Sequence, residues 1–349
     1  MPQVEHPHWD DFLAVSAQIG NEIALVQGAG GNSSLKSGNV MWIKASGTWL
    51  AEAQAQPIMV PIDLVALQKR VAAGNLSEDE IAGLTLPSGP AGLRASVETP
   101  FHALLPSDCV LHVHCVATIA TAIRADADDV LRERLSGLNW HWQPYVKPGV
   151  PLTNAMRDAG AAKAEIIVLG NHGLIAQADT PAHAMALLSK VRERLGGASL
   201  LRSASINPES SSLAADGYVP AQDRGSNDLA MVPELLALAA NCALAPDFVV
   251  FFGPSIPILP RGPDLAGQLA GLARAPLPHN AVVLVEGRGA LIRRDAMRGT
   301  KDLLAGYAQV LKRHLLNGGG TIRYFTSDEI AELLDWDAEK YRQAMNRGA

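Results

Sequence analysis

The sequence predicts an α/β fold, because stretches with helical periodicity alternate with short apolar runs that end in turns. Apolar side chains recur near helical spacing over residues 8–26 and 180–195. Short apolar runs lie between such stretches, as at 165–169, where the run is followed by Gly-Asn-His-Gly. Residues 35–44 contain two short runs joined by Ser-Gly-Asn, a pattern typical of a β-hairpin. Together these patterns predict a sheet that is covered by helices.

Apolar spacing and the residues that begin or end each run define the elements of the first two hundred residues. The helix expected at 99–105 carries Pro100 at an early position, where no backbone N–H is needed. The helix expected at 180–195 ends at Gly196 and Gly197. The other expected helices are 8–26, 63–73 and 116–124, and the expected strands are 35–36, 40–44, 110–114, 165–169 and 173–175.

A polar stretch divides the chain. Residues 203–212 and 223–228 are rich in Ser, Asn and Asp, as linkers between domains often are. We therefore expect an N-terminal domain at 1–205, a polar linker at 206–228 and a C-terminal α/β region at 229–349.

Composition restricts the class of protein. The 349 residues carry a net charge of −6, which argues against nucleic acid or an anionic membrane as a general partner. Charged residues make up 18% of the chain, so apolar surface is expected to be covered in a homo-oligomer. Three cysteines without paired spacing fit a reducing compartment. The start of the chain shows no signal-peptide pattern and no apolar run is long enough to span a bilayer, so we expect a cytoplasmic protein.

Two histidines separated by one residue follow an apolar run. Residues two apart on a strand point to the same face, so His112 and His114 can direct two imidazoles at one point. His172, between the glycines of Gly-Asn-His-Gly, is the candidate third ligand. Three neutral imidazoles leave a coordination position open, as in catalytic zinc sites. Zn²⁺ is the expected ion, and Mn²⁺ or Fe²⁺ would tolerate the same ligands.

Each of these residues also has a structural interpretation. A His-x-His pair often arises by chance on a buried strand, and a histidine in a glycine-rich turn can serve the turn alone. His102 is interpreted as a residue that packs or orients its neighbours, and His141 as a spare ligand. A single carboxylate such as Glu98 is usually solvated. The functional interpretation therefore depends on the whole constellation.

The order of these motifs resembles that of the class II aldolase and adducin family. The motifs are Glu-x-x-x-His, then His-x-His, then Asn-His-Gly. Upstream, residues 28–35 resemble the family's Gly-Asn-x-Ser loop, and residues 42–48 resemble its second strand and Ser-Gly turn. Together these motifs cover about residues 10 to 200. The residues within these motifs most resemble those of the aldolase half of bifunctional rhamnulose-phosphate aldolase/alcohol dehydrogenases.

The resemblance implies a fold and a site. The implied fold has α/β/α layers around a central, mainly antiparallel sheet, here with a C-terminal α/β extension. The implied metal ligands are His112, His114 and His172, and the implied general acid/base is Glu98. The phosphate and substrate contacts carry over to Asn32, Ser33, Ser46, Gly47 and Ser96.

One departure from the family pattern bears on the phosphate contacts. Many of the aldolases have two serines just before the glutamate, whereas here Ser96 is followed by Val97. One hydroxyl donor is therefore lost, for which Lys44 could compensate. The identity of the sugar stays open.

The implied reaction is cleavage of a ketose 1-phosphate to dihydroxyacetone phosphate and an aldehyde, through a metal-stabilised enediolate. Epimerases, dehydratases and decarboxylases of the family share the three-histidine site and stay open as alternatives. A non-catalytic adducin-like scaffold and a sugar-phosphate sensor are alternatives of another class. Scaffold members have lost the histidines that this chain retains, which favours an enzyme. The implied partners are a small sugar phosphate and further copies of the chain in a tetramer.

The C-terminal region contains an internal echo of the N-terminal one. The runs IIVLGNHGLI and VVLVEGRGALI share a strand, a glycine-flanked turn, a second apolar strand and a following helix. Arg288 falls near the place of His172, and no His-x-His precedes it. We therefore interpret the region as a degenerate, metal-free repeat. Its expected elements are strands at 248–252 and 281–285 and helices at 300–315 and 327–345.

Overall fold

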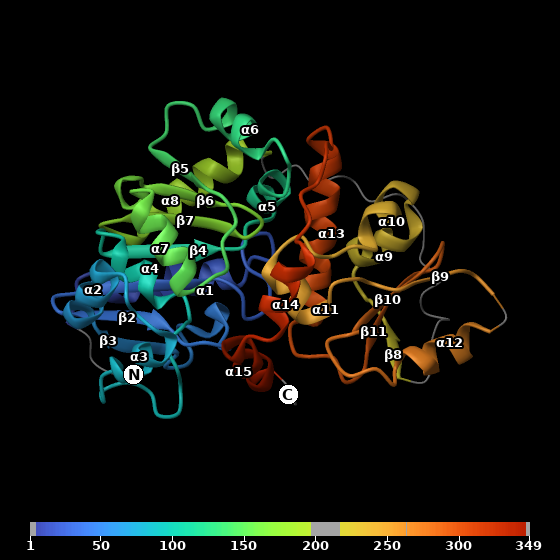
Figure 1. The fold of residues 1–349 in the computed structure, drawn as a ribbon, viewed down its shortest axis with the longest axis horizontal. Helices are drawn as coiled ribbons and strands as arrows, with labels where there is room; N and C mark the ends of the chain where they lie inside the picture. Colours follow the sequence, from blue (N-terminus) through green and yellow to red (C-terminus); the bar gives the residue numbers. More distant parts are fainter. Residues whose placement is uncertain (1–4, 197–216, 263, 347–349) are drawn as a thin grey trace. The chain divides into compact units, whose positions relative to one another are not determined.

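The computed structural model describes residues 5–196, 217–262 and 264–346 (Figure 1). These residues fall into two compact units, one within Met1–Thr118 and Ala127–Gly197 and the other within Ile119–Asp126 and Ala198–Ala349. The predicted boundaries at 205 and 228 stay predictions. Part of the expected linker, 206–216, lies outside the described residues. The rest of the expected linker, 217–228, contains a strand and the start of a helix.

The N-terminal unit is built on a seven-stranded sheet with the order β3-β2-β1-β4-β7-β6-β5. All neighbouring strands are antiparallel except the parallel pair β5 and β6. The predicted α/β fold with a mainly antiparallel sheet is therefore confirmed. The strands are β1 (Asn32–Ser37), β2 (Val40–Lys44), β3 (Met59–Asp63), β4 (Cys109–Val113), β5 (Trp140–Gln143), β6 (Ile166–Leu169) and β7 (Gly173–Ala178).

Helices pack on both faces of this sheet. On one face, α2, α4 and α7 contact one another and cover apolar side chains such as Val110, Ile167 and Ile175. On the other, α1 and α8 contact each other and strands β1, β4 and β7. The helices of this unit are α1 (Trp9–Gly20), α2 (Leu64–Ala73), α3 (Glu78–Gly83), α4 (Thr99–Leu104), α6 (Ala127–Arg134), α7 (Val150–Asp158) and α8 (Pro181–Arg194), with short 3₁₀ turns at Leu50–Glu52 and Ala161–Lys163. Helix α5 (Val116–Ala122) begins in this unit and ends in the other.

The C-terminal unit has a four-stranded sheet with the order β8-β11-β10-β9. The strands are β8 (Tyr218–Pro220), β9 (Ile258–Leu259), β10 (Val282–Val285) and β11 (Gly289–Arg293). The helices are α9 (Arg224–Met231), α10 (Pro233–Ala239), α11 (Pro246–Phe252), α12 (Leu265–Leu272), α13 (Thr300–Leu316), α14 (Ser327–Leu334) and α15 (Asp337–Met345). None of the helices in the described ranges is long and apolar enough to cross a membrane.

This order repeats that of β4-β7-β6-β5 in the N-terminal unit. In both sheets the first two pairs are antiparallel and the last pair is parallel. The two central hairpins share a turn hydrogen bond: the amide of His172 donates to the Leu169 carbonyl, and that of Arg288 donates to the Val285 carbonyl. The echo seen in the sequence therefore corresponds to the same local architecture.

Two expectations about the C-terminal unit were wrong. Residues 248–252 were expected as a strand and form helix α11, with Pro246 in its first turn. Phe248 and Phe252, four residues apart, stack with ring centroids 6.1 Å apart, and Tyr307 of α13 packs against both. Every side chain of α11 is buried, so no polar face marked the helical period. The helix expected at 327–345 is broken into α14 and α15.

Candidate metal and acid–base site

The site is centred on the end of β4, which carries His112, while His114 directly follows the last strand residue, Val113. His112 lies opposite Asn32 of β1, and both side chains lie on the sheet face covered by α4. The glycine before Asn32 allows this close pairing, because a Cβ on Gly31 would lie 2.7 Å from the backbone oxygen of His112. Gly31 also has a φ of +58°, which favours glycine. The glycine-rich loop therefore delivers Asn32 to the side of His112.

The hairpin between β6 and β7 brings the third histidine to the same place. Its turn contains Asn171 with a φ of +50°, a left-handed conformation that asparagine tolerates better than most residues. A Cβ on Gly173 would lie 2.4 Å from the backbone oxygen of Val113, so only glycine lets β7 begin beside β4. The turn sequence thereby places His172 between the end of β6 and the start of β7, where β7 begins beside β4.

The three imidazoles converge in a buried cluster. The ring centroids of His112, His114 and His172 lie 4.9 to 5.2 Å apart. One nitrogen of each ring lies within 4.8 Å of the others. The Nδ1 of His112 lies 3.2 Å from the Leu174 carbonyl, to which it donates in the neutral ring, so Nε2 keeps its lone pair. The predicted convergence of the three side chains is observed.

This donor set fits a divalent metal ion. Three neutral imidazoles are ligands that Zn²⁺, Mn²⁺ and Fe²⁺ accept, and a buried cluster lacking a cation would gain little from bringing them together. Among the described residues, no other group of three or more His, Cys, Asp or Glu side chains has this spacing. Cys109, on β4, and Cys115, two residues after that strand, are buried thiols outside the cluster, so a strand position was predicted correctly for Cys109 alone. His141 is also outside the cluster.

Glu98 is not solvated but lies against the cluster. Its Oε2 is 3.4 Å from Nε2 of His112, and its Oε1 is 3.4 Å from Nε2 of His172. Burial raises the pKa of this carboxyl, but the charges of His112, His172 and His114 when protonated, and a hydrogen bond from Asn32, outweigh burial and bring the pKa to about 2. Positive charge among these rings therefore favours the ionised form of Glu98.

Two of the predicted phosphate residues adjoin Glu98. The Nδ2 of Asn32 donates to Oε2 of Glu98 at 2.7 Å and to Oγ of Ser96 at 3.2 Å. Ser96 Oγ also accepts from the backbone N–H of Glu98. Both hydrogens of the Asn32 amide are thereby directed within the protein, and a contact of Asn32 with phosphate stays a prediction.

The remaining predicted phosphate residues lie at different places. The Ser33 side chain points to the opposite sheet face from Asn32, where its hydroxyl lies 2.8 Å from that of Ser16 in α1. The turn with Ser46 and Gly47 adjoins the segment before Ser96, because the Ser46 amide donates to the Arg94 carbonyl. Phosphate binding by Ser33, Ser46 and Gly47 stays a prediction.

Lys44 does not extend into solvent. Its ammonium group is buried and donates to the carbonyl oxygens of Ala29, at 2.8 Å, and Thr48, at 2.7 Å. These carbonyls belong to the glycine-rich loop and to the Ser-Gly turn, respectively. Lys44 therefore holds together the two loops that carry the predicted phosphate contacts.

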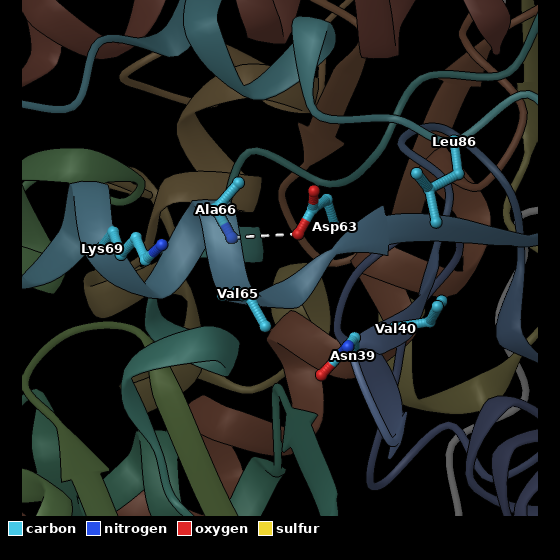
Figure 2. A pocket seen from close by; sticks show the side chains of 7 residues that line it. All are labelled: Asn39, Val40, Asp63, Val65, Ala66, Lys69 and Leu86. Carbon is cyan, nitrogen blue, oxygen red and sulfur yellow. Dashed lines mark hydrogen bonds between the residues drawn. The ribbon is translucent and has the colours of Figure 1, made fainter.

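A surface pocket of the same unit is separate from this cluster. Its lining includes Asn39 in the hairpin turn, Lys69 of α2 and Asp63, as Figure 2 shows. The Oδ1 of Asp63 accepts a hydrogen bond from the Ala66 amide and caps α2, so this carboxylate has a structural function. None of the residues that line the pocket belongs to the histidine cluster.

Two polar residues of the site received no catalytic role from the sequence. Ser34 and His102 lie beside Asn32 and are fully buried. Both had a signal: Ser34 alternates with Asn32 along β1, and His102 lies four residues after Glu98, on the same side of a helix. The signal did not say which partners they would meet.

Comparison with known proteins supplies the family context. The family model for the class II aldolase and adducin N-terminal domain matches residues 11–195. An uncharacterized oxidoreductase of Bacillus subtilis, YuxG, is 28% identical over 184 residues, which are 49% of this chain and 26% of that protein. Among solved structures, the N-terminal class II aldolase domain of a conserved Thermoplasma acidophilum protein is 23% identical, covers 56% of this chain and 94% of that one, and has a TM-score of 0.48. The L-fuculose-1-phosphate aldolase of Thermus thermophilus is 17% identical, covers 53% and 91%, and has a TM-score of 0.34.

Proposed function

The chain belongs to the class II aldolase and adducin family, and from this premise we propose that it is a metal-dependent lyase that cleaves a ketose 1-phosphate to dihydroxyacetone phosphate and an aldehyde. The aldolases among its structural relatives support this class of substrate. The oxidoreductase name of the Bacillus relative belongs to a protein of which the match spans 26%.

One observation carries the proposal: a buried carboxylate and three imidazoles meet at one point. The carboxylate oxygens of Glu98 lie 3.4 Å from Nε2 of both His112 and His172. A scaffold protein gains nothing from burying an ionised group beside titratable rings, because burial of charge costs free energy. An active site gains from this arrangement, because a base and a cation site must both lie within reach of one substrate.

The division of labour follows from the charges. The three histidines would hold a divalent ion, which would supply Lewis-acid polarisation of substrate oxygens. The Glu98 carboxylate accepts the proton of the hydroxyl group on the carbon that leaves as the aldehyde, while the bond between that carbon and its neighbour breaks. Glu98 then returns a proton to the neighbouring carbon, which remains in the dihydroxyacetone phosphate. The proton is thereby conserved, and the products are one aldehyde and one molecule of dihydroxyacetone phosphate.

Phosphate binding is assigned to the loops that Lys44 joins. The backbone amides and hydroxyls around Asn32 and Gly47 are the donors that an oxyanion requires. Lys44 lies between these loops, with its ammonium group 2.8 Å from the Ala29 carbonyl, and would add a positive charge to the proposed phosphate site. This arrangement supplies charge in place of the hydroxyl that Val97 lacks.

The test begins with the metal content of the protein purified without chelator, which we expect to be about one zinc, manganese or iron per chain. The protein is then offered a panel of ketose 1-phosphates, and release of dihydroxyacetone phosphate is followed by its enzymatic reduction. The variant Glu98→Gln keeps the carboxyl's shape and should retain the metal. It should lose turnover by about 10²- to 10⁴-fold, the usual contribution of an acid/base group.

The outcomes separate the alternatives. Absence of metal, with none taken up on dialysis, contradicts the lyase and favours a binding protein or scaffold. Full turnover in the Glu98→Gln variant removes Glu98 from proton transfer. Conversion of a sugar phosphate without release of an aldehyde would replace aldol cleavage by epimerisation or dehydration at the same site.

A further inference from the structure

A continuous line of buried polar groups runs from β1 to Glu98. The Oγ of Ser34 lies 2.7 Å from Nδ1 of His102, and Nε2 of the same ring lies 2.5 Å from Oδ1 of Asn32. The other end of the Asn32 amide, Nδ2, donates to Oε2 of Glu98 at 2.7 Å. All four side chains are buried, so each contact is made away from bulk water.

The chemistry of the groups gives this line a direction. The amide nitrogen of Asn32 faces Glu98, because Nδ2 donates both to Oε2 of Glu98 and to Oγ of Ser96. The Asn32 oxygen then faces His102, and because an amide oxygen only accepts, Nε2 of His102 must carry a hydrogen. In a neutral ring Nδ1 is then an acceptor, and the Ser34 hydroxyl donates to it.

The surroundings keep the His102 ring neutral and in place. The ring stacks on Phe101 with the centroids 4.6 Å apart. Burial lowers the pKa of His102 well below the usual range, although the charge of Glu98 acts in the opposite sense. A neutral ring has a single N–H, so when Nε2 of His102 donates a hydrogen bond, Nδ1 can only accept one.

We propose that His102 is a positioning residue: it fixes the orientation of the Asn32 amide and, through it, the placement of the Glu98 carboxylate against His112 and His172. The inference rests on the proposed function, because it matters for catalysis only if Glu98 transfers the proton. Without the ring, the amide of Asn32 can rotate and present its oxygen to the carboxylate. Small misplacements of a catalytic group are costly, about 10²-fold for 1 Å.

A pair of isosteric substitutions separates positioning from packing. In His102→Gln the amide nitrogen can reach the place of Nε2 and still donate to Asn32. In His102→Asn the amide nitrogen reaches only the place of Nδ1, and the Asn32 oxygen loses its donor. We expect kcat of the Asn variant to fall by about 10- to 100-fold with KM and metal content nearly unchanged, and kcat of the Gln variant to stay within about threefold of the original.

Equal losses in both variants, or a loss that appears in KM or metal content alone, would overturn the positioning role. Neutron diffraction from crystals of the unmodified protein in D₂O supplies a readout that needs neither activity nor a variant. Deuterium on Nε2 of His102, with the ND₂ group of Asn32 toward Glu98, supports the proposal. Deuterium on Nδ1 alone, on both ring nitrogens, or a reversed Asn32 amide contradicts it. If the protein cleaves no ketose 1-phosphate, the proposed function fails while the diffraction result still decides the hydrogen-bond direction.

Discussion

The two units contain a similar hairpin in the same strand order, but the turn of that hairpin carries different side chains. In the N-terminal unit the turn from Leu169 to Gly173 carries His172, and in the C-terminal unit the turn from Val285 to Gly289 carries Arg288. The third turn residue is left-handed in both, Asn171 with a φ of +50° and Gly287 with a φ of +64°. The two turns therefore share this left-handed residue, whereas their side chains differ, and Gly289 has a φ of +136° that Gly173 does not share.

The neighbouring strands extend this difference. His112 lies opposite Ile175, two residues after the turn glycine, and Pro220 of β8 lies opposite Leu291, also two residues after its turn glycine. The residue that corresponds to His114 is Gln222. Proline has no ligand atom in its side chain, and arginine keeps its positive charge at any pH of interest. The framework alone therefore provides no metal site, and the identities of three side chains decide whether one exists.

The largest expected effect comes from substituting the corresponding turn residues. His172→Ala removes one of three ligands, so we expect the metal to be lost and lyase turnover to fall below detection. Arg288→Ala alters the same turn position in the other unit and should leave the metal content unchanged. Elemental analysis of both variants, with circular dichroism as a check of folding, measures this contrast. Metal loss in the Arg288 variant would mean that the C-terminal turn contributes to the site.

A smaller effect separates crowding from backbone strain. Gly173→Ala pushes a Cβ to 2.4 Å from the Val113 oxygen and 3.2 Å from Cε1 of His112, and should destabilise the N-terminal unit by about 3 kcal/mol or more. Gly287→Ala meets no atom closer than 3.8 Å, so it should cost only the left-handed strain, about 1 kcal/mol. Thermal unfolding with separate fits to each transition measures both. Equal losses would show that the close approach of β7 to β4 is easily relieved.

Much of the N-terminal unit could be predicted from local patterns. The hairpin at 35–44, the apolar strand before His112 and the helix with Pro100 in its first turn are all present. These features depend on spacing and on turn residues, which the sequence displays directly. Strand periodicity predicted that His112 and His114 point the same way, whereas the approach of His172 to them gained its support from the family resemblance, because no local pattern reports that two distant strand ends meet.

The errors have a common physical cause. Helix α11 was mistaken for a strand because all of its side chains are buried, so its apolar run lacks the polar positions that reveal a period. The sequence indicated that His102 packs or orients its neighbours but, for a related reason, did not indicate which neighbours it contacts. A buried hydrogen-bond line between β1 and α4 depends on side-chain orientation, and residue type alone gave no partner for Ser34 or Asn32.

The two units also differ in how each accommodates a buried lysine. In the C-terminal unit Lys312 pairs with Asp228, with 2.5 Å between Nζ and Oδ2. In the N-terminal unit Lys36 instead donates to the carbonyl oxygens of Leu105 and Ser107, each at 2.5 Å. Burial lowers the pKa of Lys36 to about 8, although the charge of Asp108 acts to raise it. Two carbonyl oxygens thus accept hydrogen bonds from the ammonium group of Lys36 without balancing its charge.

The pH dependence of stability tests this difference. The pKa of Lys36 lies near 8 in the folded protein and near 10.5 in the unfolded chain, so between these values the unfolded chain binds more protons. The penalty for burying the charge is fully present below pH 8 and is relieved as the pH rises. Relative to Lys36→Met, which carries no charge, the original protein should therefore gain up to about 3 kcal/mol between pH 8 and 10.5. Urea unfolding of both proteins across this range measures the gain, and parallel stability curves would show that Lys36 titrates like a solvated lysine.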